Sequence, residues 1–351
     1  AGAPNVLFVV GDDIGWNDVS WHGNTEVETP VLGALATSGI RLEQLYGGPQ
    51  CTPSRSAIMS GRYPSHVGLQ HHVLGRNLRH LPLSILTIAD QMYAQGFSTH
   101  AAGKWHLGQA SFSEAPSLRG YETYYGYLGG AEDYYKHELL NSSTTPASFV
   151  VNGKDTGLYS ADLFTDFLIQ TVEEHAKQPE EERTPLFLTH FFQNSHSPIE
   201  QPPANPEFVA TGANNFPLRG GKHTLWQGGV RNVAFVHDAR PGAVTGDYHG
   251  LMHEIDWMPT LVEGLLGRTL SKDDYPIPVD GMNQWSAMTA GATPPRDEVL
   301  LNLDPVTEDS WFGGYAGIIK GDFKLLVGNP GTPNDWCGTQ IGASQPAQTN
   351  D

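Results

Sequence analysis

Short apolar runs alternate with helix-forming segments through the N-terminal part of the chain, and few folds accommodate such an alternation. The runs at Asn5–Val10, Phe97–Ala102 and Pro185–Phe192 have the length and composition of buried strands. Between them, Ser84–Gln95 and Tyr159–Lys177 carry apolar residues at helical spacing. Strands that alternate with helices predict an α/β fold with a mostly parallel sheet sandwiched by helices.

Several other segments carry start and stop signals for helices or strands. Thr29 and Pro30 predict a helix at Val31–Ser38, with Thr29 as the N-cap and Pro30 in the first turn. The remaining predicted elements are a strand at Ile40–Tyr46, a helix at Thr52–Ser60 that Gly61 ends, a helix at Tyr248–Leu266 and a hairpin at Tyr315–Val327. From residue 301 onward we expect a reduced antiparallel part and then a polar tail.

Composition and charge exclude several classes of protein. With 39% hydrophobic residues, the chain is too apolar to be disordered. Its formal net charge of -18 argues against a nucleic-acid partner, because the phosphate backbone would repel it. The apolar runs are far shorter than the roughly 20 residues of a membrane span. Two cysteines cannot build a disulfide framework.

Polar residues follow the predicted strands, where open α/β sheets bind their ligands. Asp12 and Asp13 come directly after the first strand. Because adjacent carboxylates repel each other, such a pair favours a bound cation, and Ca²⁺ or Mg²⁺ prefers oxygen ligands. The alternative is an Asp-rich turn in which Asp13 caps a helix.

Cys51-Thr52-Pro53-Ser54-Arg55 lies at the start of a predicted short helix. Free N–H groups at a helix start favour an anion and a reactive group, and Arg55, one turn along, can brace an oxyanion. Alternatively, Cys51 is a small buried residue. A phosphatase thiolate of the Cys-x5-Arg type is excluded, because position 57 is Ala57.

Two more strand ends carry candidate residues. Lys104 and His106 lie in Gly103–Gly108, whose glycines let the backbone approach a ligand; the alternative is a surface loop. His196 follows the strand that ends at Phe192, and an imidazole is a natural proton donor near neutral pH. We interpret His190 as a core histidine, and His71-His72 as solvated side chains or a metal-binding pair.

The Cys51–Arg55 pentapeptide, with the Asp pair before it and Gly61-Arg62 after it, resembles the signature of the formylglycine-dependent sulfatases. In that family a formylglycine-generating enzyme reads Cys, Pro and Arg at these spacings and converts the cysteine to formylglycine. The segments Gly126–His137 and Leu218–Val230 are similar to the arylsulfatase B-like branch. The resemblance covers most of residues 4–330.

The resemblance implies an alkaline phosphatase-like fold, with a catalytic domain at 1–300 and a truncated C-terminal subdomain at 301–351. The implied activity is the hydrolysis of a sulfated small molecule or a glycosaminoglycan-type sugar, as in arylsulfatases and N-acetylgalactosamine-4-sulfatase. It also implies that Asp12, Asp13 and the oxygens of converted Cys51 bind Ca²⁺ or Mg²⁺. The other implied roles are sulfate binding by Arg55, Lys104 and Lys222, contact with the formylglycine hydroxyls by His106, and proton donation to the departing alcohol by His196.

Two features bear on localisation. Asn141-Ser142-Ser143 fits the glycosylation sequon, and the chain begins at Ala1 without an initiator Met. We therefore expect a glycoprotein of the secretory pathway, lysosomal or extracellular, from which a signal peptide has been removed; the alternative is that the chain is a fragment.

One departure from the family concerns the metal site. Sulfatases complete it with an Asp-Asn pair on a strand between the His196 and Lys222 regions, but here residues 201–207 run almost directly into 212–217. We expect a helix and a strand to be missing near 204–213, which would leave unpaired backbone groups on the neighbouring strands. Two alternatives to an active sulfatase follow: an impaired relative that binds sulfated glycans, or a phosphate or phosphonate ester hydrolase.

Overall fold

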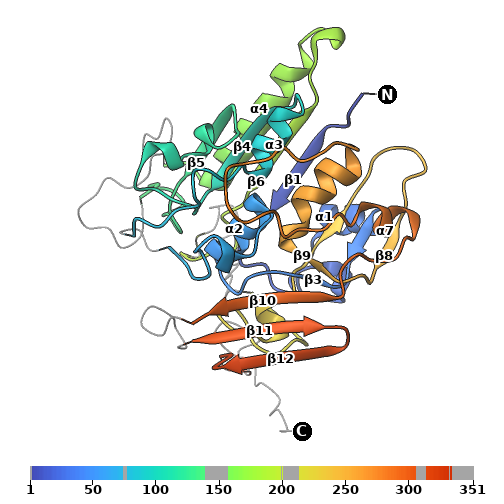
Figure 1. Ribbon diagram of the computed structural model, residues 1–351. Coiled ribbons are helices and arrows are strands. Elements are labelled where there is room, and N and C mark those ends of the chain that lie inside the picture. The colour runs from blue at the N-terminus through green and yellow to red at the C-terminus, as the bar shows by residue number, and fades with distance from the viewer. Residues whose placement is uncertain are drawn as a thin grey trace. The chain divides into compact units, whose positions relative to one another are not determined.

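The computed structural model describes residues 2–73, 77–138, 157–198, 200, 213–305, 314–331 and 333 (Figure 1). The chain divides into two compact units, each made of three separate stretches. Unit 1 comprises Ala1–Asp12, Cys51–Pro206 and Glu254–Trp285. Unit 2 comprises Asp13–Gln50, Glu207–His253 and Ser286–Asp351.

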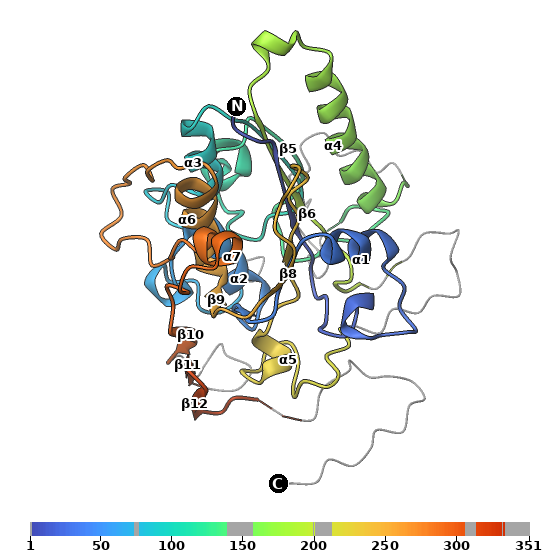
Figure 2. The ribbon, with the colours of Figure 1, turned by 90° about the vertical axis from the view of Figure 1, so that its right-hand side faces the viewer.

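A four-stranded parallel sheet forms the centre of unit 1, in the order β1-β6-β4-β5. Its strands are β1 (Val6–Val10), β4 (Ser98–Lys104), β5 (Thr123–Tyr127) and β6 (Leu186–Phe191). Figure 2 shows α4 (Ser160–Ala176) on one side of this sheet, and α3 (Ile88–Ala94) and α6 (Trp257–Pro259) on the other. The predicted α/β fold with a mostly parallel sheet between helices is confirmed.

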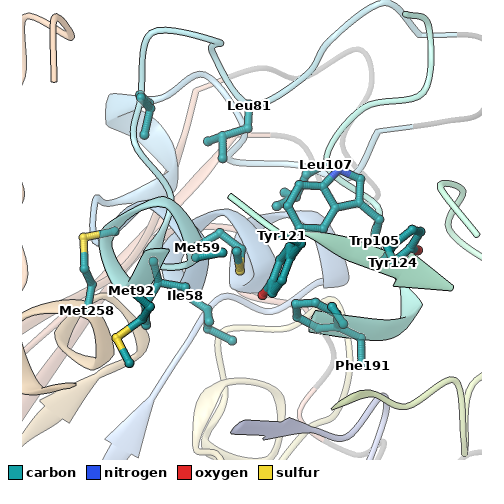
Figure 3. Packing of buried hydrophobic residues seen from close by; sticks show 14 of the residues in the cluster. Ile58, Met59, Leu81, Met92, Trp105, Leu107, Tyr121, Tyr124, Phe191 and Met258 are labelled. Atoms are coloured by element: carbon teal, nitrogen blue, oxygen red, sulfur yellow. The ribbon is translucent and has the colours of Figure 1, made fainter. Parts of the chain in front are cut away.

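Two apolar clusters hold the faces of this sheet. On one face, side chains of α2 (Cys51–Ser60) and α3 meet Trp105, Tyr121 and Phe191, and Figure 3 shows this packing. On the other face, α4 buries Phe164 and Leu168 against β4 and β5. Both clusters include residues of the central strands. Their packing holds β4 and β6 in place and so fixes where the loops after these strands begin.

The strand β1 differs from its prediction. It lies at the edge of the sheet, where among the described residues only β6 pairs with it. Leu7 and Val9 are 65% and 49% exposed. One face of this strand is therefore exposed, whereas the sequence predicted that the whole strand is buried. An open edge is what we expect of a strand beside the missing segment, but residues 201–212 themselves lie outside the described part of the chain.

In the residues that the structure describes, unit 2 contains three small sheets. The first has the order β7-β2-β8, formed by β2 (Ile40–Leu42), β7 (Phe235–Val236) and β8 (Gly246–Tyr248), and the second pairs β3 (Leu45–Tyr46) with β9 (Met252–His253). The third is an antiparallel meander of β10 (Glu298–Asp304), β11 (Tyr315–Lys320) and β12 (Phe323–Gly328) (Figure 1). The predicted hairpin at Tyr315–Val327 is confirmed, whereas the predicted strand Ile40–Tyr46 is two strands.

The helices also show two corrections. The predicted helix Tyr248–Leu266 is wrong in its first half, because Tyr248 ends β8 and Met252–His253 pair with β3. The helix α1 (Pro30–Thr37) forms as expected, but the Thr29 hydroxyl accepts from the Ser20 backbone N–H at 3.0 Å rather than capping the helix. Further helices in the described ranges are α5 (Gln227–Val230), α7 (Trp285–Ala290) and a π-helix at Thr260–Leu265 that continues α6, besides several short 3-10 helices. None of the helices in the described ranges has the length and apolar character needed to cross a membrane.

Two buried histidines are expected to make the folded protein less stable at acidic pH. Burial lowers the pKa of His190 to about 4, and burial together with Arg296 lowers the pKa of His253 to about 3. Each is neutral in the folded protein, whereas the unfolded chain takes up a proton below pH 6.5. The stability that the folded protein gains from keeping these two histidines neutral is therefore complete above pH 6.5 and is lost as the pH falls below it. We expect the free energy of unfolding to drop by up to about 2 kcal/mol per histidine between pH 7 and pH 5. Urea unfolding at both pH values measures this, and an unchanged pH dependence in His190→Asn would contradict it.

Candidate active site

Cys51 is the first residue of α2, and of the nine residues that follow it, from Thr52 to Ser60, all except Ser54 are buried. Pro53 lies in the first turn. Backbone N–H groups there have no acceptor within the helix, so the absence of an N–H in proline costs no helical hydrogen bond. The Thr52 hydroxyl accepts from the Val73 N–H at 3.1 Å and donates to the His106 carbonyl at 3.4 Å. These bonds fix the start of α2 against the loop that follows β4.

Two buried cations converge on one buried carboxylate. Lys104, fully buried at the end of β4, donates from Nζ to Asp12 Oδ2 at 2.5 Å, and Arg55 Nη2 lies 3.5 Å from the same oxygen. Arg55 also donates to the Lys104 carbonyl, and its guanidinium lies over the Phe191 ring. Because two positive groups share one negative group, this cluster of charges favours an anion despite the overall charge of -18.

Close backbone contact explains the glycine before Lys104. Gly103 has a φ of +105°, and a Cβ there would lie 1.8 Å from the Phe191 carbonyl oxygen. Any side chain would therefore push β4 away from β6 and displace Lys104 from Asp12.

His106 lies beside Cys51 with a defined ring orientation. Its Nε2 is 2.9 Å from the Val73 carbonyl, so this nitrogen carries the proton and Nδ1 is the acceptor. Burial lowers the pKa of His106, and a hydrogen bond to the Cys51 side chain partly opposes that shift. The ring is thus a neutral base next to residue 51. Gly130 leaves room for it, since a Cβ there would lie 2.7 Å from the His106 ring.

His196 completes the group around Cys51. Ligand atoms of Asp12, Cys51 and His196 all lie within 4.8 Å of one another. The Ser195 N–H donates to the Asp12 carbonyl at 2.7 Å, and the Asp12 N–H donates to the Asn194 carbonyl at 3.2 Å. These bonds join the end of β1 to the loop after β6, which brings the predicted acid and the predicted metal ligand together.

The other two predicted site residues belong to unit 2. Lys222 donates from Nζ to Asp13 Oδ2 at 2.7 Å, and Asp13 has a φ of +58°. An aspartate tolerates this backbone conformation better than most residues, and such strain is common at functional sites. The predicted sulfate ligand and the predicted metal ligand are therefore paired with each other.

The residues around Cys51 fit part of a metal site. In the part of the chain that the structure describes, Asp12, Cys51 and His196 are the group whose ligand atoms lie close enough to hold one ion. Asp12 and two hydroxyl oxygens on a converted residue 51 would supply fewer than the roughly six to eight oxygens that Ca²⁺ takes. Water would have to complete the shell.

Sequence reasoning missed one residue of this region. Tyr134 is buried, and its hydroxyl lies 3.0 Å from the carbonyls of both Gln193 and His196. A tyrosine that contacts a loop distant in sequence has no spacing pattern, so no signal in the sequence could have found it.

A family model described as Sulfatase matches residues 4–215, and the chain belongs to the sulfatase family. Among curated relatives, it is 32% identical to arylsulfatase J of Mus musculus, over 95% of this chain and 65% of that protein. It is 26% identical to arylsulfatase A of Bos taurus, over 93% of this chain and 74% of that protein. The chain thus spans somewhat less than two thirds of the length of arylsulfatase J.

Solved structures share the fold at lower identity. The crystal structure of Ps i-CgsB in complex with k-i-k-neocarrahexaose has a TM-score of 0.77 and 23% identity, covering 92% of this chain and 84% of that one. The phosphonate monoester hydrolase SpPMH from Silicibacter pomeroyi has a TM-score of 0.65 and 17% identity, covering 94% and 88%.

The alignment with arylsulfatase J extends over 405 positions, more than the 351 residues of this whole chain. That relative therefore carries segments inside the aligned region for which this chain has no counterpart.

Proposed function

We propose that this chain hydrolyses sulfate esters through a formylglycine made from Cys51. The observation that carries the proposal is the grouping of Asp12, Cys51 and His196 within 4.8 Å, beside the buried cations Lys104 and Arg55. A nucleophile, a proton donor and charges that oppose an anion are the parts that sulfate transfer needs. Membership of the sulfatase family supports the same activity.

In this mechanism the aldehyde of residue 51 is hydrated to a geminal diol. One hydroxyl gives its proton to the Asp12 carboxylate and attacks sulfur, and the S–O bond to the substrate alcohol breaks as His196 gives that alcohol a proton. His106 Nδ1, the ring nitrogen that is not bonded to the Val73 carbonyl, then accepts the proton of the second hydroxyl. The C–O bond to sulfate breaks, sulfate leaves, and the aldehyde forms again.

The charged residues bind the transferred group. Arg55 and Lys104 oppose the negative charge on the sulfate oxygens, and Lys222 is proposed to do the same. A divalent cation, Ca²⁺ or Mg²⁺, would be held by Asp12, Asp13 and the residue-51 oxygens, and when bound it would supply further positive charge for the sulfate oxygens. The substrate is a sulfated small molecule or a glycosaminoglycan-type sugar. The required partner is a formylglycine-generating enzyme, and we propose a lysosomal or extracellular location.

A second candidate function rests on the incomplete metal shell. Because Lys104 and Arg55 share the single carboxylate of Asp12, the chain has positive charge to bind a sulfate group even where turnover fails. It would then be an impaired relative that binds sulfated glycans. The phosphate or phosphonate ester hydrolase considered from the sequence is not favoured, because the curated relatives named above are arylsulfatases.

The leaving group tests the role of His196. His196→Ala is expected to slow hydrolysis of a sulfated sugar alcohol by about 10²–10⁴-fold, because that poor leaving group needs the proton. An activated aryl sulfate should lose far less. Steady-state kinetics on both substrates measure the difference, with His175→Ala on α4 as the matched control. Equal losses on both substrates would show that His196 is not the acid.

A further inference from the structure

The loop that carries His196 has no regular secondary structure, although a proton donor must be held in a defined place. It begins after β6 and includes Gln193, Asn194 and Ser195. The backbone bonds to Asp12 described above fix one side of it. The other side is fixed by side chains that the mechanism does not use.

Tyr134 bridges the two ends of this turn. Its hydroxyl has one proton and lies 3.0 Å from each of the carbonyl oxygens of Gln193 and His196, so the two acceptors share it. One of these carbonyls belongs to His196 itself. The Tyr134 ring is 1% exposed and stacks on Tyr159, with ring centroids 5.3 Å apart.

Neighbouring bonds restrain Tyr134 and the turn together. Asn194 donates to the Tyr159 hydroxyl at 2.7 Å, which in turn donates to the Glu200 carbonyl at 3.1 Å. The Glu200 carboxylate accepts from the Tyr134 N–H at 2.6 Å. Two further bonds hold the Gln193 side chain, from the Ser160 hydroxyl at 2.8 Å and to the Glu132 carbonyl at 2.8 Å.

We propose that Tyr134 is a positioning residue for His196. Its hydroxyl sets where the His196 backbone lies, and therefore where the imidazole meets the departing alcohol. This inference rests on the proposed function for its effect on turnover. Its effect on the loop does not depend on turnover, so the two can be tested apart.

The experiment uses Tyr134→Phe, which removes the hydroxyl and keeps the stacked ring. Turnover of a sulfated sugar alcohol is expected to fall about tenfold, as for one lost hydrogen bond, while turnover of an activated aryl sulfate stays within about twofold. Hydrogen exchange of the Ser195 and His196 amides is expected to become about tenfold faster. Tyr121→Phe is the matched control, because it removes a buried hydroxyl that contacts Thr189 and not this loop.

The control should change neither the exchange of these amides nor the ratio of the two activities. A Tyr134→Phe protein that loses both activities equally, with unchanged exchange at Ser195 and His196, would overturn the proposal. If the unaltered chain hydrolyses neither substrate, the proposed function fails. The exchange measurement would then still support or overturn the effect of Tyr134 on the loop.

Discussion

Cys51→Ala is expected to abolish hydrolysis of a chromogenic aryl sulfate, with a loss of more than about 10⁴-fold. The methyl group of alanine has no thiol to convert, so no aldehyde forms, and neither the attacking hydroxyl nor the hydroxyl that expels sulfate can form. Residual turnover would come only from Arg55, Lys104 and the other binding groups. Initial rates with equal amounts of folded protein measure the effect.

Two controls separate conversion from other effects of the substitution. Cys51→Ser keeps a polar side chain of similar size but should be as inactive as Cys51→Ala in a host that does not convert serine. Cys337→Ala replaces the other cysteine of the chain and should leave turnover unchanged. Substantial activity in Cys51→Ala would remove residue 51 from the mechanism.

The second prediction is that turnover needs an unusually high concentration of divalent metal ion. Because the ligand set is incomplete and Asp12 is paired with Lys104, we expect little or no turnover at ordinary Ca²⁺ levels. Half-maximal turnover should need about 10⁻³ M Ca²⁺, as at weak calcium sites. Titration of aryl sulfate turnover against Ca²⁺ and Mg²⁺, with metal analysis of the purified chain, measures this.

Asp12→Asn should abolish the response to metal, whereas Asp162→Asn, an exposed carboxylate on α4, should not alter it. If the purified chain held stoichiometric metal tightly and had normal turnover, other residues would have to replace the missing Asp-Asn pair of the family's metal site. If the chain held no metal and showed no turnover but still bound a sulfated glycan, the result would favour the second candidate function, an impaired relative that binds sulfated glycans.

Much of the fold could be predicted because local patterns agreed with it. The strands at Val6–Val10, Ser98–Lys104 and Leu186–Phe191 lie where the apolar runs are, and α2 begins at the predicted reactive cysteine. Asp12 and His196 follow the carboxyl ends of β1 and β6, and Lys104 is the last residue of β4, so the order of the strands brings these residues close together.

The rest depended on contacts between distant residues. Composition could not show that β1 lies at the edge of the sheet in the described part of the chain, because an apolar run looks the same with one neighbour as with two. The first half of the helix predicted at Tyr248–Leu266 was wrong because pairing of Met252 and His253 with β3 outweighs local helical spacing. The roles of the site residues and the division at residue 300 stay predictions.

The state of residue 51 tests the central claim most directly. The tryptic peptide Leu42–Arg55, from protein made in a cell that has the generating enzyme, can be examined by mass spectrometry. We predict a peptide lighter than the thiol form by the difference between a –CH₂SH and a –CHO group, which a hydrazine probe captures. A peptide that carries only the free thiol, alkylated in full by iodoacetamide, would contradict the proposed mechanism.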